Sequence, residues 1–292
     1  MSANQQSESH ASDDAHAPLH PQPPALVRPA VWPRLLTYGT VLAALSAVAL
    51  GARPLVLAAL LLSVCIWIAI GMMSPRSGIF ARPALGCAPG RGRIALTFDD
   101  GPDPAVTPRL LELLAAHGQR ATFFLIGRRA QAHPDLVRAI VARGHAIGNH
   151  SYTHAWSTPL WTTGRLAADL ARCQEVLMRA AGVRPRWFRP PVGLFGPRVE
   201  SAARRVSLAL CGWTLRSNDG ALFGYDATRV RARVLARLRD GDVILLHDGA
   251  ERSHRRPRAP EVLPALLELL AARGLRSVTL DELLAPELES ES

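Results

Sequence analysis

The first quarter of the chain contains two apolar stretches that carry no charged residue. They cover residues 35–52 and 54–75, and a short turn with Gly51 and Arg53 separates them. A helix needs about 20 apolar residues to cross the hydrocarbon core of a membrane. We therefore predict a two-helix transmembrane hairpin over residues 31–75, in the inner membrane of a bacterium. The alternatives are a buried helical pair of a soluble domain and a signal peptide, which fits poorly because two apolar runs follow one another.

The regions around this hairpin have a different composition. Residues 1–30 are rich in small and polar side chains and hold few large apolar groups, so we expect a disordered tail. Residues 76–92 form a predicted linker, and residues 286–292 a short tail. The hairpin therefore precedes a single large domain, which we place at residues 93–285.

Within that domain, short apolar runs alternate with amphipathic stretches. The predicted strands are 94–98, 121–126, 145–148, 187–189, 208–213, 243–246 and 277–280. The predicted helices include 107–117, 133–143, 164–181, 228–239 and 260–273. Regular alternation of strand and helix predicts a parallel sheet with helical crossovers, either an open doubly wound sheet or a barrel.

Composition changes this interpretation little. The 34 basic residues, all arginine, outnumber 24 acidic ones and give a net charge of +10. Because the arginines are scattered and no nucleic-acid motif occurs, we expect no nucleic-acid partner. The four cysteines have no Cys-x-x-Cys spacing, so they predict neither a disulfide framework nor a zinc knot.

Polar residues that can act as acids, bases or metal ligands follow the ends of the predicted strands. Asp99 and Asp100 end the first strand and His150 follows the third. Arg189, Asp219 and His247 lie at the ends of later strands. The carboxyl ends of parallel strands are the edge where active sites form. Singly, each residue has an ordinary interpretation, such as a turn or a surface histidine, but their common edge favours one site.

Two adjacent carboxylates and two histidines four residues apart suit a metal centre. Asp100, His150 and His154 supply oxygen and imidazole ligands, which zinc or a similar divalent metal such as cobalt or nickel accepts. Asp99 is then left as a general base for water activated by the metal. The set predicts a metal-dependent hydrolase.

The ordered motifs resemble those of the polysaccharide deacetylases, which contain the NodB homology domain of carbohydrate esterase family 4. The matching segments are Thr97-Phe98-Asp99-Asp100-Gly101-Pro102, His150-Ser151-Tyr152-Thr153-His154, Arg189-Pro190-Pro191-Val192-Gly193 and Leu245-Leu246-His247. The resemblance covers roughly residues 93–284. It implies a distorted (β/α) barrel of about seven parallel strands and hydrolysis of the amide bond of N-acetylated amino sugars.

The expected mechanism assigns further residues. Arg189 would hold Asp99 and keep it ionised. Asp219 would orient His247, and His247 would protonate the departing amine. By resemblance, the backbone N–H of Val192 would stabilise the oxyanion. Leu245 would line the pocket for the acyl methyl group.

The chain departs from the family's pattern in two motifs. Val192 stands where an aromatic residue is usual, and the fourth motif reads Arg216-Ser217-Asn218-Asp219-Gly220 instead of Asp-x-x-Asp-Trp. The catalytic groups are kept, whereas the sugar site is expected to be shallower or differently shaped.

Three functional hypotheses follow. The first is a membrane-anchored deacetylase of an N-acetylated amino-sugar polymer, and the second is a deacetylase or deformylase of a lipid-linked amino sugar. The third is a carbohydrate-binding relic without catalysis. The second gains from four arginines between residues 252 and 258, which suit phosphate recognition. It also gains from the arginines flanking the apolar runs, which favour cytoplasmic termini, although most of the resembled family works outside the cytoplasm.

Overall fold

The computed structural model describes residues 26–27, 32–51, 54–87, 89–155, 157–217, 219, 227–249 and 259–284. Most of the predicted N-terminal tail, the C-terminal tail and the arginine-rich loop at 252–258 lie outside these residues. Two residues of the predicted tail do form structure, because β1 (Leu26–Val27) pairs antiparallel with β2 (Gly86–Cys87).

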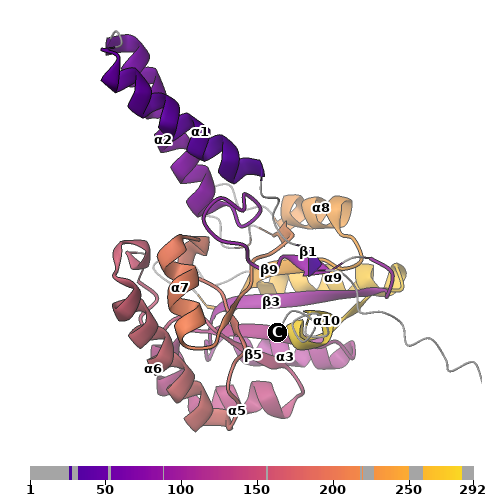
Figure 1. Cartoon of the computed structure of the whole chain (residues 1–292). Helices are drawn as coiled ribbons and strands as arrows, with labels where there is room; N and C mark the ends of the chain where they lie inside the picture. The colour runs from indigo at the N-terminus through magenta and orange to yellow at the C-terminus, as the bar shows by residue number, and fades with distance from the viewer. Residues whose placement is uncertain are drawn as a thin grey trace, which may run out of the picture.

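Two helices project from the rest of the chain (Figure 1). They are α1 (Trp32–Ala49) and α2 (Pro54–Met73), which lie side by side. Among the described helices, only α2 is long and apolar enough to cross a membrane, over Val56–Met73, and the apolar part of α1 is shorter, Leu35–Ala49. Just 6% of the α2 window is buried, so this helix is not a core helix of the chain. Membrane crossing by either helix therefore stays a prediction.

The domain that follows is built on a curled parallel sheet. Its strands run in the order β7-β6-β5-β4-β3-β9-β8, and β10 pairs with β3 off this path. The bounds are β3 (Arg93–Gly101), β4 (Ala121–Leu125), β5 (Ala146–Asn149), β6 (Trp187–Phe188), β7 (Ala209–Leu210), β8 (Leu215–Arg216), β9 (Val243–His247) and β10 (Arg276–Ser277). The predicted parallel α/β sheet is confirmed. All pairs in this sheet are parallel.

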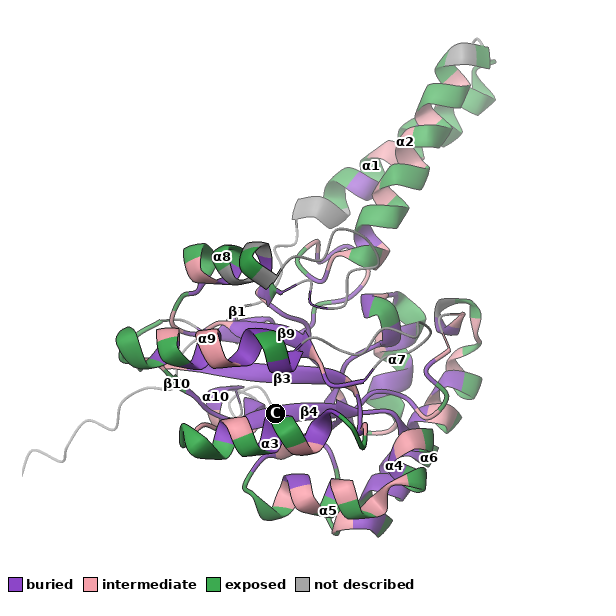
Figure 2. Cartoon of the chain, turned by 180° about the vertical axis from the view of Figure 1, so that it is seen from behind, coloured by how far each residue is buried: buried purple, intermediate pink, exposed green. Residues whose placement is uncertain are grey.

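Helices cover the outside of the sheet, where Figure 2 shows buried strands beneath partly exposed helices. The bounds are α3 (Thr107–Ala116), α4 (Gly127–Ala132), α5 (Pro134–Ala142), α6 (Thr163–Ala181), α7 (Pro197–Arg205), α8 (Ala227–Arg237), α9 (Ala259–Ala272) and α10 (Leu280–Leu284), with short 3₁₀ turns η1 (Thr158–Leu160) and η2 (Pro191–Gly193). Two details of the predicted strands were wrong. The run 277–280 is mostly not a strand, because α10 begins at Leu280, and the two-residue strand β8 was not anticipated.

The curled sheet is open between β7 and β8, the two ends of the strand path. Residues from the predicted linker occupy this opening. Ala84 forms a parallel bridge with Cys211 just after β7, and Gly86 forms an antiparallel bridge with Asp242 just before β9. A segment that follows the hairpin thus lies between the two ends of the curled sheet.

Strand β3 shows how the pleat separates core from site. Phe98 packs in the cluster between the sheet and the outer helices, whereas Ala95 packs in the cluster on the inner face. Successive side chains of a strand point to opposite faces. Asp99 therefore shares the inner face with Ala95 and Thr97, inside the curl of the sheet.

Candidate active site

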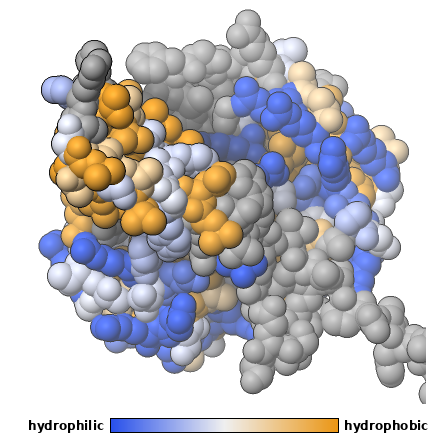
Figure 3. Space-filling view, turned by 45° about the horizontal axis from the view of Figure 1, so that its top comes forward, coloured by the Kyte–Doolittle hydropathy of each residue, from blue (hydrophilic) through white to orange (hydrophobic). Residues whose placement is uncertain are grey.

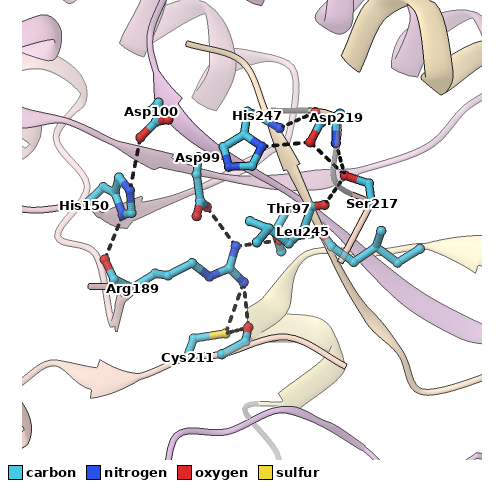
Figure 4. Close-up of polar contacts among 12 residues, drawn as sticks. Thr97, Asp99, Asp100, His150, Arg189, Cys211, Ser217, Asp219, Leu245 and His247 are labelled. Atoms are coloured by element: carbon cyan, nitrogen blue, oxygen red, sulfur yellow. Dashed lines mark hydrogen bonds and ion pairs between the residues drawn. The ribbon is translucent and has the colours of Figure 1, made fainter. Parts of the chain in front are cut away.

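The predicted site residues gather at one edge of the sheet (Figure 4). Asp99 and His247 are register partners on the neighbouring strands β3 and β9. His150 directly follows β5, Arg189 directly follows β6, and Asp219 lies three residues after β8. The parallel strands bring these five side chains together because each strand ends at the same edge.

Asp100, His150 and His154 form a compact cluster. Their candidate ligand atoms all lie within 4.8 Å of one another. Asp100 Oδ1 lies 3.3 Å from His150 Nε2 and 3.0 Å from His154 Nε2. Burial alone would raise the pKa of Asp100, but hydrogen bonds from His150 and then His154 hold it well below its usual value.

Hydrogen bonds around the cluster orient its histidines. The ring Nδ1 of His150 lies 2.7 Å from the carbonyl oxygen of Arg189. A carbonyl only accepts, so Nδ1 donates, and this bond orients the ring with Nε2 facing Asp100. The backbone N–H of His154 donates to Ser151 Oγ at 2.9 Å. Such hydrogen bonds behind the ligands are typical of built metal sites, so the residues present fit a divalent cation.

The backbone that carries this cluster adopts strained conformations, at the end of β3 and in the loop after β5. Asp100, Ser151 and His154 have φ values of 76°, 64° and 51°. Positive φ is uncommon for residues other than glycine and concentrates at functional sites. The Ser151 N–H donates to Asn149 Oδ1 at 2.8 Å, and the Tyr152 N–H donates to Asp169 Oδ2 at 2.8 Å. Neither Asn149 nor Asp169 was predicted from the sequence as part of the site.

Asp99 is held by a buried arginine. Arg189 is fully buried and donates from Nη1 to Asp99 Oδ1 at 2.8 Å and to Thr97 Oγ1 at 2.7 Å. Its Nη2 donates to the carbonyl of Gly212 at 2.7 Å, and its guanidinium lies 4.2 Å from the ring centroid of Phe124. The ion pair between Arg189 and Asp99 thus lies in a rigid setting, with Asp99 beside the metal-ligand cluster (Figure 4).

His247 is paired with Asp219. Its Nδ1 lies 2.8 Å from Asp219 Oδ1, and its backbone N–H donates to Asp219 Oδ2 at 2.9 Å. Ser217 Oγ donates to Asp219 Oδ1 at 2.7 Å and further fixes the carboxylate. Burial lowers the pKa of His247, but the charges of Asp219, Asp100 and Asp99 outweigh it and raise the pKa to about 9. A ring with this pKa carries its proton at neutral pH.

Val192 and Leu245 lie in contrasting environments. Val192 has φ 59° and ψ 4° within η2, and it is 57% exposed. A β-branched residue at positive φ is a clear outlier, so the loop imposes this conformation on it. Leu245 is 3% exposed and is the register partner of Thr97, beside the Asp99–Arg189 pair.

One further acidic residue at this edge escaped the sequence analysis. Asp248 directly follows His247, is fully buried and accepts a hydrogen bond of 2.7 Å from Thr107 Oγ1. Burial is the main cause that raises its pKa, to about 7. Its carboxylate also packs against Gly101, where a larger side chain would collide with it. Its position next to His247 was the available signal.

Comparison with known proteins identifies the family. Residues 87–210 match the family model for polysaccharide deacetylases. A chitooligosaccharide deacetylase from a Bradyrhizobium strain is 34% identical over 215 residues, which covers 66% of this chain and 91% of that relative. The chain belongs to the polysaccharide deacetylase family, as the motifs predicted.

Solved structures agree with this assignment. The peptidoglycan deacetylase PdaC from Bacillus subtilis has a TM-score of 0.60 and 27% identity, over 70% of this chain and 95% of that one. A family 4 pseudoenzyme from Bacillus anthracis has a TM-score of 0.62 and 25% identity, over 72% of each chain. The fold is therefore shared by catalysts and by a protein described as a pseudoenzyme. Whether this chain is a catalyst depends on its own site residues and not on its fold.

Proposed function

We propose that the chain is a membrane-anchored, metal-dependent hydrolase that removes N-acetyl groups from an amino-sugar polymer. The observation that carries this proposal is the joint arrangement of three parts at one sheet edge. These are the Asp100–His150–His154 cluster, Asp99 held by Arg189, and His247 held by Asp219. A relic without catalysis would need none of these pairings.

Asp100, His150 and His154 would hold the cation, with zinc as the first choice and cobalt or nickel as alternatives. When bound, such a cation acts as a Lewis acid that lowers the pKa of water and polarises the acyl oxygen. Asp99 would accept the proton of the attacking water, with Arg189 supplying the opposite charge that keeps the carboxylate in place. The acid–base pair then consists of Asp99 and His247.

The second half of the reaction releases an amine, which is a poor leaving group unless it is protonated. His247 would deliver that proton, and Asp219 would hold its ring in the correct orientation. The backbone N–H of Val192 would donate to the developing oxyanion. Leu245 would contact the acyl methyl group from the inner face of the sheet.

A second candidate substrate is a lipid-linked amino sugar. One contact favours it: the Phe195 N–H donates to the Met72 carbonyl at 2.7 Å. This bond ties the loop that follows Val192 to the last turn of α2. A substrate presented at the membrane surface would lie near such a loop. The arginines at 252–258 that also suggested this substrate lie outside the described residues.

The proposal is tested with the full chain purified in a neutral detergent. Amine release is measured on N-acetylglucosamine oligomers, on peptidoglycan and on a lipid-linked N-acetylated amino sugar, before and after chelation and after addition of Zn²⁺, Co²⁺ or Ni²⁺. We expect activity that chelation abolishes and one of these ions restores. An inactive metal-loaded protein would favour the carbohydrate-binding relic, and the preferred substrate decides between polymer and lipid-linked sugar.

A further inference from the structure

A polar pocket lies where the apolar hairpin joins the catalytic domain. Its volume is about 790 Å³, and one side is lined by Met73, the last residue of α2, and by the three residues that follow, Ser74 to Arg76. Arginines from three other segments line it as well: Arg216 on β8, Arg233 and Arg237 on α8, and Arg239. We call this the arginine pocket.

The arginine pocket carries a surplus of positive charge. Arg76, Arg216, Arg233, Arg237 and Arg239 are exposed, and no ion pair joins any of them to a carboxylate within the described part of the chain. Asp240 and Asp242 also line the pocket. Their carboxylates are already engaged.

Backbone N–H groups occupy both carboxylates. Those of Gly90, Arg91, Gly92 and Arg93 donate to Asp240 over 2.6 to 3.0 Å. The Arg239 N–H donates to Asp242 Oδ2 at 2.7 Å. Arg76 also donates from its guanidinium to the Thr214 carbonyl oxygen. The side chains left to bind a ligand are therefore those of Arg216, Arg233, Arg237 and Arg239, and the ligand they suit is an anion.

The pocket is separate from the candidate active site. Gly241 and Asp242, which line it, immediately precede β9, whereas His247 ends that strand at the opposite edge of the sheet. Met73 both lines the pocket and ends the apolar window Val56–Met73. Figure 3 shows the apolar hairpin and a strongly hydrophilic surface on the same face of the molecule. If α2 spans the membrane, the pocket lies at the level of the lipid headgroups.

We propose that the arginine pocket binds the phosphate of an anionic phospholipid headgroup, in the leaflet where α2 ends. The guanidinium group pairs with phosphate oxygens through two parallel hydrogen bonds, and basic residues beside a membrane are attracted to anionic lipids. The site rests on the membrane anchoring proposed above, but it does not depend on the deacetylase chemistry. A bound lipid would fix the domain against the membrane beside the hairpin.

The test uses the full chain in a neutral maltoside detergent and three probes. These are dioctanoyl phosphatidylglycerol, dioctanoyl phosphatidylcholine and inorganic phosphate, each titrated while binding is followed by thermophoresis. We expect phosphatidylglycerol to bind at least tenfold more tightly than either of the others. The variant Arg233→Gln/Arg237→Gln should weaken phosphatidylglycerol binding by about tenfold or more. The control Arg109→Gln/Arg179→Gln removes the same charge from exposed sites on α3 and α6 and should bind as the wild type does.

Two results would overturn the proposal. One is equal binding of phosphatidylglycerol and inorganic phosphate to the wild type, which would make the pocket an unspecific anion site. The other is an equal loss of lipid affinity in the pocket variant and in the control. The wild-type titrations alone decide the first point if a variant fails to fold. Deacetylase activity of the same preparations on soluble oligomers is recorded separately, so a failure of lipid binding is distinguishable from a failure of the proposed catalysis.

Discussion

Arg189 and His150 are joined by a hydrogen bond of 2.7 Å between the Arg189 carbonyl oxygen and His150 Nδ1. The side chain of the same arginine donates to Asp99 at 2.8 Å. One residue therefore orients the ring of a proposed metal ligand through its backbone and holds the proposed base through its side chain. Because the two roles use different atoms, they can be separated by mutation of their partners.

Replacing Asp99 should separate catalysis from metal binding. Asp99→Asn keeps an oxygen that can accept from Arg189 but removes the basic carboxylate. We expect the variant to retain its metal and to lose about 100-fold or more in kcat, the scale of a lost general base. Metal content by elemental analysis and kcat on N-acetylglucosamine oligomers check this, with the exposed Asp135→Asn on α5 as a control. Near-wild-type turnover in metal-loaded Asp99→Asn would remove Asp99 from the mechanism.

Replacing a proposed ligand should instead remove metal and activity together. Asp100→Ala, His150→Ala and His154→Ala each delete one donor from the cluster within 4.8 Å. We expect little retained metal after dialysis and no measurable turnover, with partial recovery only at high added metal. If any of the three variants keeps stoichiometric metal, the cation is bound elsewhere.

The proposed role of His247 predicts a dependence on the leaving group. A basic amine needs a proton to depart, whereas an activated phenolate does not. We expect His247→Ala to lose far more activity on N-acetyl sugars than on 4-nitrophenyl acetate. Asp219→Asn should shift the same ratio in the same direction but less, because Asp219 acts through His247 at 2.8 Å. Equal losses on amide and ester would make His247 structural.

The sequence predicted the edge of this site better than its interior. Asp99 and His247 end strongly apolar strands, so the periodic pattern placed both at the carboxyl edge, where they are register partners. The strand β8 contains just Leu215–Arg216 and has no pattern to detect. The Gly212 carbonyl, which accepts from Arg189 at 2.7 Å, is a backbone group, and no side-chain pattern encodes it.

The position of the linker in the sheet was also not predicted from the sequence. Residues 76–92 lack a periodic apolar pattern, yet Ala84 and Gly86 bridge to residues beside β7 and β9 and occupy the opening of the sheet. Each of the two isolated bridges involves a single linker residue, and its partner, Cys211 or Asp242, lies far away in the sequence. Local propensity therefore carries no information about them, and only the folded sheet shows what fills its gap.

The two candidate substrates require opposite sides of the membrane. A hairpin with two spans would place both termini on one side, and a phosphatase fused to the carboxyl terminus reports that side. The arginines that flank the apolar runs predict a cytoplasmic fusion without phosphatase activity. That result would favour the lipid-linked amino sugar over the polymer as the substrate. An active periplasmic fusion would overturn the arginine count and support the polymer. A cytoplasmic control fusion to a truncated chain that ends before residue 32 calibrates the inactive signal.

The buried His145 should make stability depend on pH. This ring is 5% exposed, and its Nδ1 accepts a hydrogen bond from the Ala121 N–H at 3.2 Å. Burial, followed by the charges of Arg143 and Arg120, lowers the pKa of His145 from 6.5 to about 4. As the pH falls below 6.5, His145 therefore binds a proton in the unfolded chain but not in the folded chain. Stability is lost between pH 6.5 and about 4.

The size of this effect follows from linkage, and a single substitution tests it. Between pH 7.5 and pH 5, His145 should cost about 2 kcal/mol of unfolding free energy. His145→Asn keeps an acceptor for Ala121 but does not titrate, so its loss of stability over this range should be about 2 kcal/mol smaller than that of the wild type. Denaturant unfolding at both pH values measures the difference. His117→Asn, which removes an exposed histidine at the end of α3, should follow the wild type, and an identical pH response in His145→Asn would show that His145 is protonated alike in both states.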